Sequence, residues 1–366
     1  MLPQDNRPMN TDPDARSPVF ALTLGDACGI GPEIIAKLFR QGARGGTDTR
    51  GVAVFGDVAV MRRAAALTGG LLAVAAIDRP ADALHVPPNC IPVLQVAGLP
   101  ADLLGATLGQ VDARAGAAAA ACITRAAELA MAGEVAGVVT APIHKEALAA
   151  AGVRFPGHTE MLQALAAVNG VPPAVRMMLA NDQLRTVLVT IHLSLRDAID
   201  AVTFQAVRET IRIAHRSAAR WGQSKPRIAV AGLNPHAGEG GLFGDEEIRI
   251  IRPAIDAARA EGIDAQGPFA PDTVFMRARH APPQHIGEFD VVVAMTHDHG
   301  LIPVKYLGVE QGVNVTLGLP FVRTSPDHGT AFDIAGTGRA DEASLRAALR
   351  MAQQFSRPEL SGGSAP

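Results

Sequence analysis

The sequence has few cysteines, no long apolar run and no excess of either charge, and each absence excludes a class of protein. Its 366 residues include three cysteines, Cys28, Cys90 and Cys122, which lie far apart. Three scattered thiols exclude a disulfide framework, and the lack of a CxxC pair excludes a common zinc spacing. No stretch reaches the roughly 18 consecutive apolar residues of a membrane-spanning helix. We therefore expect a cytoplasmic protein with no membrane partner.

The charges are balanced. Lys and Arg number 33 and Asp and Glu number 36, which gives a net charge of -3 without a long run of one sign. Proteins that bind nucleic acid usually carry a basic surface, so we expect no nucleic-acid partner. An anionic small molecule would have to be bound by individual basic residues.

Both ends of the chain are polar. Residues 1–17 are rich in proline and charged residues, and residues 355–366 have a similar character. Such segments contain too few apolar residues to form a packed core. We expect a disordered N-terminal lead, which is not a signal peptide, and a disordered tail.

Between these ends, short apolar runs alternate with helical segments. The apolar runs are VFALTL (19–24), GVAVFG (51–56), GVVTAP (137–142), LRTVLVTIHL (184–193), RIAVAGL (227–233) and DVVVAM (290–295). The helical segments are 32–41, 57–69, 113–132, about 203–221 and about 245–261. This alternation predicts an α/β fold with a largely parallel sheet covered by helices. The length of the chain favours two domains.

Three histidines follow three of the predicted strands. His192 comes after LVTI, His236 after AVAGLNP and His297 after VVVAMT. Because the carboxyl ends of parallel strands meet at one edge of a sheet, we expect the three imidazoles to lie at the same edge. Three imidazoles that leave coordination positions open are typical of a catalytic metal site. For each histidine taken alone, an ordinary loop position is the alternative.

The residues around these histidines support a site. His236 lies in the glycine-rich turn NPHAGEGG, of the kind that brings backbone close to a ligand. Asp298 follows His297 and can orient its ring. His299 offers a second imidazole in the same segment.

Seven sequence blocks, spread from about Phe20 to Met351, resemble the signature blocks of one family. They are GDACGIGPEI, TAPIHKEAL, FPGHTEML, LRTVLVTIHLSLRDAI, AGLNPHAGEGGLFGDEEI, MTHDHGLIPVKYLG and GVNVTLGLPFVRTSPDHGTAFDIAGTG. Together they resemble the 4-hydroxythreonine-4-phosphate dehydrogenases of pyridoxal phosphate biosynthesis. The chain departs from the usual pattern at Ala27-Cys28, at Ala141 and at His299.

The resemblance implies a set of site residues. It implies one divalent metal ion, zinc, magnesium or cobalt, held by His192, His236 and His297. It implies substrate binding by His158, Thr159, Lys305, Asn314 and Arg323, with Lys305 also a candidate for the catalytic base. The block SPDHGTAFDIAGTG resembles the adenosine-binding segment of isocitrate and isopropylmalate dehydrogenases. It implies an NAD or NADP site at His328, Gly329, Thr330 and Asp333.

The resemblance also implies an activity and an assembly. The activity is NAD(P)-dependent oxidation of 4-hydroxythreonine 4-phosphate, with decarboxylation to 3-amino-2-oxopropyl phosphate. The implied fold has two α/β/α domains around a cleft, like the isocitrate and isopropylmalate dehydrogenases. We expect residues 18–150 plus 305–354 to form the first domain and residues 151–304 the second. The implied assembly is a homodimer with the active site at the subunit interface.

Several alternatives stay open. Lys305 and Arg323 are solvated surface charges in the simplest interpretation, and Thr159 is an N-cap residue of a helix as well as a ligand contact. The substrate is 4-phospho-D-erythronate or another hydroxy acid in the nearest alternative. A phosphate acyltransferase and a noncatalytic metal- or phosphate-binding protein are more distant ones.

Overall fold

The computed structural model describes residues 18–42, 48–70 and 72–356. The predicted lead, 1–17, lies outside these residues, as does the predicted tail from 357 onward. The prediction of a tail beginning at 355 is wrong, because Phe355 is the buried last residue of helix α11 (Ala343–Phe355). Its ring packs against Trp221, with 4.8 Å between ring centroids. No helix in the described ranges is long and apolar enough to cross a membrane.

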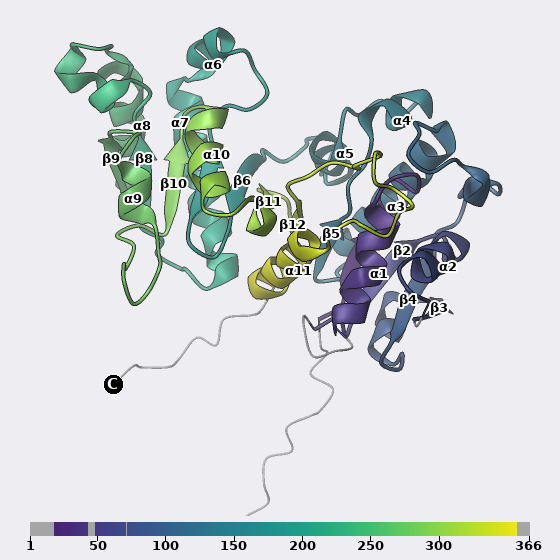
Figure 1. Cartoon of the computed structure of the whole chain (residues 1–366). Coiled ribbons are helices and arrows are strands. Elements are labelled where there is room, and N and C mark those ends of the chain that lie inside the picture. Colours follow the sequence, from purple (N-terminus) through teal and green to yellow (C-terminus); the bar gives the residue numbers. More distant parts are fainter. Residues whose placement is uncertain (1–17, 43–47, 71, 357–366) are drawn as a thin grey trace, which may run out of the picture.

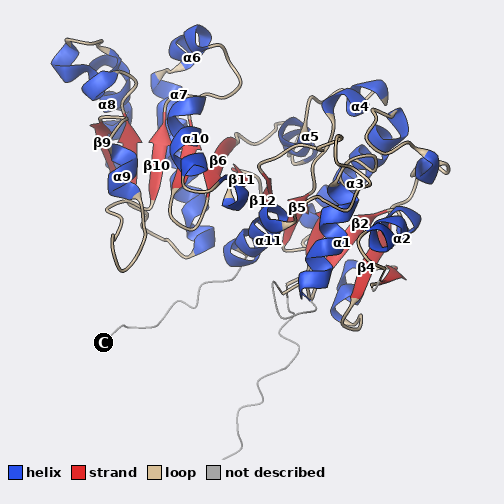
Figure 2. Ribbon diagram, in the orientation of Figure 1, coloured by secondary structure: helices blue, strands red, loops and turns tan. Residues whose placement is uncertain are grey.

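The described residues form one twelve-stranded sheet, in the order β3-β4-β2-β1-β5-β12-β11-β6-β7-β10-β8-β9. Figures 1 and 2 show its strands with the helices around them. The strands are β1 (Phe20–Thr23), β2 (Val52–Gly56), β3 (Ala73–Ile77), β4 (Cys90–Gln95), β5 (Gly137–Thr140), β6 (Arg176–Ala180), β7 (Arg185–Leu188), β8 (Ile228–Ala231), β9 (Ala265–Phe269), β10 (Val291–Ala294), β11 (Val313–Leu317) and β12 (Val322–Pro326). Within this sheet, only the pairs β12–β11, β11–β6 and β6–β7 are antiparallel. The predicted α/β class with a largely parallel sheet is confirmed.

The sheet divides into two lobes. We call β1–β5, β11 and β12 with their helices the first lobe, and β6–β10 with theirs the second lobe; β11 pairs with β6 where they join. Three successive antiparallel pairings separate β12 from β7, so the parallel strands of the two lobes run in opposite directions. Residues 18–150 and 305–354 supply the strands of the first lobe. The domain limits themselves stay a prediction.

Helices cover both faces of each lobe (Figure 2). Besides α11, the helices of the described residues are α1 (Gly31–Gly42), α2 (Val58–Leu67), α3 (Ala113–Met131), α4 (Lys145–Ala150), α5 (His158–Leu165), α6 (Leu195–Ala201), α7 (Phe204–Ala218), α8 (Arg252–Ala260), α9 (Val274–Ala278) and α10 (His297–Tyr306). In the first lobe, α3 packs on β1, β2 and β5, and α11 packs on β12, β5 and β11. In the second, α7 contacts β7, β10 and β8, as α10 contacts β6, β7 and β10.

Sequence patterns explain the predicted elements that formed. The strand VVVA of β10 is buried along its whole length, as expected for a parallel strand between two helical layers. Side chains of Asp57, Asp112 and Thr203 accept hydrogen bonds from backbone N–H groups at the starts of α2, α3 and α7. The segment predicted to be helical from about 245 begins instead with a π-helical turn, Glu247–Ile251, before α8. Glu247 of this turn accepts a hydrogen bond from the backbone N–H of Leu233, in the segment before His236.

A close approach of two helices fixes the position of α4. A Cβ atom placed on Gly116 of α3 would lie 2.0 Å from the carbonyl oxygen of Ala147 in α4. Only glycine permits this contact. The helix α4 that packs here begins with Lys145, in the segment that follows β5.

We therefore expect Gly116→Ala to destabilise the protein. Alanine favours a helix over glycine by about 1 kcal/mol, but the clash with Ala147 should cost about 2 kcal/mol or more, so the net effect is destabilising. Denaturant unfolding measures it. Gly105→Ala is the control, because the nearest atom to its new Cβ lies 3.7 Å away. Equal stability of the two variants would contradict the close helix contact.

Candidate active site

A cavity of about 420 Å³ lies between the two lobes. Its floor includes side chains from one face of the central strands: Arg323 and Ser325 of β12, Asn314 of β11 and Met177 of β6. Segments that follow β5 and β7 form its walls. The other lining residues are Thr140, Pro142, Ile143, Lys145, Pro156, Gly157, His158, Thr159, Glu160, Ile191, His192, Pro326 and His328. Segments from both lobes therefore meet around one cavity, as the prediction of a cleft requires.

Arg323 is the most buried charge of this cavity. It is 3% exposed, so the interpretation as a solvated surface charge is wrong for this residue. Its guanidinium donates hydrogen bonds to Thr316 Oγ1 (3.0 Å) and Thr140 Oγ1 (2.8 Å), and its buried Nε has no hydrogen-bond partner among the described residues. Burial lowers the pKa of Arg323 to about 10, against a smaller opposing effect of Glu160. The group is still a cation at neutral pH, with a free donor.

His158 and Thr159 lie at the start of α5. The helix begins at His158 with Gly157 at the N-cap position, so the prediction that Thr159 is the N-cap is wrong. Burial, and then the charge of Arg323, hold the pKa of His158 well below 6.5. Its buried Nε2 has no hydrogen-bond partner in the described part of the chain. A neutral imidazole with an unused nitrogen therefore faces the same cavity as Arg323.

The remaining predicted substrate residues have different surroundings. Asn314 lines the cavity and is half-buried. Lys305 lies on α10, is exposed and pairs with Asp327 at 2.8 Å. It is not one of the residues that line the cavity. The structure thus brings together four of the five predicted substrate residues.

The cavity is also lined by two charged residues that the sequence patterns did not predict, Lys145 and Glu160. Lys145 is the first residue of α4, and Glu160 lies in the first turn of α5. Both belong to sequence blocks that were recognised, TAPIHKEAL and FPGHTEML. The position of Lys145, just after the end of β5, was the available signal, because parallel strands present ligand-binding residues at that end.

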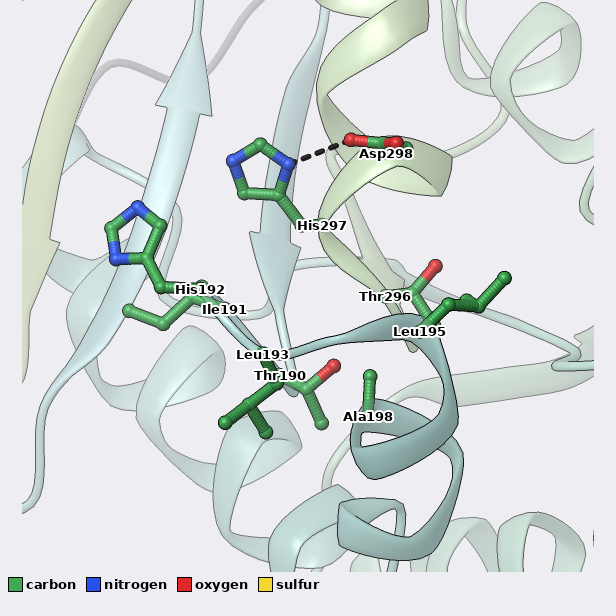
Figure 3. A pocket seen from close by; sticks show the side chains of 9 residues that line it. All are labelled: Thr190, Ile191, His192, Leu193, Leu195, Ala198, Thr296, His297 and Asp298. Atoms are coloured by element: carbon green, nitrogen blue, oxygen red, sulfur yellow. Dashed lines mark hydrogen bonds and ion pairs between the residues drawn. The ribbon is translucent and has the colours of Figure 1, made fainter.

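The three histidines follow neighbouring strands. His192, His297 and His236 come after β7, β10 and β8, which are adjacent and parallel in the sheet. The three strands therefore point in the same direction, and the shared site of the three imidazoles stays a prediction. His192 and His297 are close together, with 5.7 Å between ring centroids, and Figure 3 shows them at the wall of a smaller pocket of about 190 Å³.

The close pair has the features of metal-binding imidazoles. His297 Nδ1 lies 2.8 Å from Asp298 Oδ1 (Figure 3), and this contact can orient the ring, whose Nε2 has no hydrogen-bond partner among the described residues. Burial, then Lys145 and His297, lower the pKa of His192, which keeps it neutral at neutral pH. His299 is half-buried, and burial lowers its pKa too, but it does not line this pocket. His297 is therefore the imidazole that lies beside His192.

His236 is not gathered with this pair. Its side chain is exposed, and its ring lies 6.1 Å from that of Phe243. Within the described ranges, no group of three or more His, Cys, Asp and Glu side chains is placed to hold a metal ion. The single chain thus brings together two of the three predicted ligands.

The predicted cofactor segment lies at the edge of the cavity. His328 lines the cavity and is exposed, as are Gly329 and Asp333, whereas Thr330 is buried against Gly29. The backbone N–H of Ile30 donates to Thr330 O (3.0 Å). Three of the four predicted residues are therefore accessible to a ligand.

The segment that follows is anchored by Glu33 of α1. Its carboxylate is 2% exposed and accepts hydrogen bonds from the backbone N–H groups of Gly336 and Gly338. A buried carboxylate thus anchors the second half of the segment that resembles an adenosine site.

Comparison with known proteins gives one consistent result. Residues 48–352 match the family described as "Pyridoxal phosphate biosynthetic protein PdxA". The chain is 55% identical to a 4-hydroxythreonine-4-phosphate dehydrogenase of Beijerinckia indica subsp. indica, over 93% of this chain and 95% of that protein. It is 46% identical to a D-threonate 4-phosphate dehydrogenase of Pectobacterium atrosepticum, over 93% and 99%. The crystal structure of a 4-hydroxythreonine-4-phosphate dehydrogenase from Klebsiella pneumoniae is similar with a TM-score of 0.84, at 45% identity, covering 94% of this chain and 99% of that one.

The lowered pKa of His158 predicts a pH dependence of stability. Below pH 6.5, its ordinary value, the unfolded chain takes up a proton that the folded His158 does not, so the free energy of unfolding falls as the pH drops. In metal-free protein, His158→Gln should weaken this fall between about pH 7 and about pH 5. Urea unfolding measures it, and exposed His85→Gln, the control, should keep the wild-type profile. An unchanged profile in His158→Gln would contradict the neutral state of His158.

Proposed function

The chain belongs to the family of the pyridoxal phosphate biosynthetic protein PdxA, and from this membership we propose that it oxidises 4-hydroxythreonine 4-phosphate with NAD or NADP. The product, after loss of carbon dioxide, is 3-amino-2-oxopropyl phosphate. The observation that carries the proposal is a buried Arg323 with a free donor in a cavity whose wall bears His192, the neighbour of His297. The cavity combines an anion-binding group with metal-binding imidazoles.

Arg323 is suited to bind a phosphate or carboxylate of the substrate. A guanidinium can engage two oxygens of such a group, and its charge acts strongly where water is excluded. His158 adds an imidazole nitrogen that can hydrogen-bond to a ligand, and Lys145 adds a basic side chain to the same cavity. Thr159 and Asn314 supply hydroxyl and amide groups that orient the ligand. Glu160 is the acidic group suited to the substrate's ammonium.

His192 and His297 fit a divalent metal ion, and His236 is the proposed third ligand. The fit rests on the neutral His192 ring and on the Asp298 contact that leaves His297 Nε2 free. Imidazole ligands favour zinc or cobalt over magnesium, which prefers oxygen ligands. A bound ion would lower the pKa of the substrate hydroxyl and stabilise the negative charge that develops during decarboxylation. The chain's own residues hold the substrate in place for both steps.

We propose that a second copy of the chain completes the site in a homodimer. Exposed apolar side chains flank the histidine loops: Leu193, Leu195 and Ile199 around α6, and Leu242, Phe243 and Ile248 after His236. Apolar patches at such positions are typical of subunit interfaces. Contact between two copies would bury these side chains and bring a His236 of one subunit to the His192–His297 pair of the other.

We also propose residues for the nicotinamide cofactor and for the catalytic base. The accessible residues His328, Gly329 and Asp333 are proposed to contact NAD or NADP. Thr330 is buried against Gly29 and is proposed to support their loop. Lys305 stays a candidate base, and its ammonium pairs with Asp327, the residue before His328, at 2.8 Å. Lys145 is a second candidate, because it lines the cavity.

D-threonate 4-phosphate is a second candidate substrate. It is favoured by the 46% identity to the Pectobacterium atrosepticum protein of that name. D-threonate 4-phosphate and 4-phospho-D-erythronate carry a hydroxyl at C2 where 4-hydroxythreonine 4-phosphate carries an amino group. Glu160 in the cavity favours the amino compound.

A substrate panel tests the proposal. We expect the purified protein to reduce NAD or NADP fastest with 4-hydroxythreonine 4-phosphate, and more slowly with D-threonate 4-phosphate and 4-phospho-D-erythronate. Absorbance of the reduced cofactor and release of carbon dioxide are the measurements. A chelator should abolish both, and zinc or cobalt should restore them. Absence of cofactor reduction with all three compounds would reject the dehydrogenase, and acyl transfer to phosphate would favour an acyltransferase.

Loss of His236 tests the metal ligand set. His236→Ala should reduce metal-dependent cofactor reduction by a factor of about 100 or more, because a catalytic site with two imidazoles binds the ion weakly. The fold should persist, since the side chain is exposed. His85→Ala, on the surface of the first lobe, should behave as wild type. Near-normal turnover of His236→Ala would remove His236 from the ligand set.

A further inference from the structure

The turn that carries His236 has an unusual backbone. Six consecutive residues, 236–241, have positive φ angles of 52°, 53°, 79°, 43°, 67° and 103°. Three of these residues are glycines, whereas His236, Ala237 and Glu239 carry side chains that are sterically disfavoured in this left-handed region. A left-handed turn of this length does not persist by itself. The surrounding structure must hold it.

Glu247 is the residue placed to hold this turn. It lies in the π-helical turn before α8 and is 1% exposed. Its carboxylate accepts hydrogen bonds from the backbone N–H groups of Leu233 and Asn234, both at 2.7 Å, and from Asn234 Nδ2 at 2.9 Å. These donors lie immediately before His236. The carboxylate therefore fixes the point at which the chain enters the turn.

The same carboxylate is also tightly enclosed by the turn. A Cβ atom on Gly232 would lie 2.9 Å from Glu247 Oε1, and one on Gly238 would lie 2.8 Å from Glu247 Oε2. Glycines thus let the backbone pass directly over the carboxylate, both before the turn and within it. Glu247 lines neither the large cavity nor the pocket of His192 and His297. It can act on a ligand only through the backbone that it holds.

We propose that Glu247 is a positioning residue that holds the left-handed turn in the shape in which His236 binds a divalent metal ion. This role rests on the proposed function, in which His236 is a ligand. Without the carboxylate, the N–H groups of Leu233 and Asn234 lose their acceptor, and the turn relaxes toward ordinary backbone angles. His236 then has to be ordered during metal binding, which weakens the affinity.

Three variants test this role. Glu247→Gln keeps the shape of the side chain but puts an NH2 group where an oxygen accepts a hydrogen bond, and Glu247→Asp shortens the side chain by one methylene. We expect each to raise the Kd for zinc and for cobalt about 10- to 100-fold. Asp256→Asn is the control. Asp256 lies on α8 with a side chain that is 60% exposed, and this substitution removes one negative charge, as Glu247→Gln does. Its Kd values should equal those of wild type.

Two measurements separate positioning from general destabilisation. In metal-free Glu247→Gln, hydrogen exchange should be faster than in wild type at the amides of Ala237 and Phe243, and unchanged in β10. These two amides donate to Asn234 O and Gly238 O within the turn. At saturating zinc or cobalt, kcat of Glu247→Gln should return to within about threefold of wild type, because the metal then orders the turn. If Glu247→Gln does not fold, Asn234→Ala removes one of the carboxylate's donors and serves in its place.

The possible outcomes are distinct. Unchanged Kd values in Glu247→Gln and Glu247→Asp, with wild type binding zinc, would overturn the role of Glu247 and leave the proposed function standing. Quickened exchange throughout the second lobe would also overturn it, because a merely structural residue has that effect. Wild-type protein that binds neither zinc nor cobalt would overturn the metal site, and the role of Glu247 with it.

Discussion

A guanidinium buried in the sheet is the feature on which the rest of the site depends. Arg323 is bound by the hydroxyls of Thr140 and Thr316, which come from the strands on either side of β12. Both partners are neutral hydroxyls, so neither cancels the charge, and Nε has no hydrogen-bond partner among the described residues. Burying a cation without an ionic partner is costly. Binding of an anionic ligand at Arg323 would offset this free-energy cost.

The direction of the strands explains why a cavity forms around Arg323. The lobes share one sheet, but three antiparallel pairings reverse the direction of the second lobe's parallel strands relative to those of the first. The segments after β5 and β7 therefore leave the sheet in opposite directions, and both line the cavity over the central strands. Lys145 enters from the first lobe and His192 from the second. A site built in this way needs both lobes in place.

Two buried carboxylates hold the loops of the site. Glu33 accepts hydrogen bonds from the N–H groups of Gly336 and Gly338, and Glu247 accepts them from those of Leu233 and Asn234. In both cases a carboxylate binds backbone of a glycine-rich loop that has no regular hydrogen-bond pattern. Loops of this kind otherwise expose unsatisfied backbone groups or remain mobile. The two carboxylates therefore order these loops, and neither lines the large cavity or the pocket of His192 and His297.

The sequence by itself determined the local structure and the family. Apolar runs predicted the strands that precede His192, His236 and His297, because each run lies within a few residues of its histidine. The burial of Arg323 and the start of α5 at His158, with Gly157 at the N-cap, were decided only by the tertiary structure. So were the pairing of Lys305 with Asp327 and the separation of His236 from the other two histidines. They depend on which strands become neighbours and in which direction they run, and contacts between residues distant along the chain leave no local pattern in a single sequence.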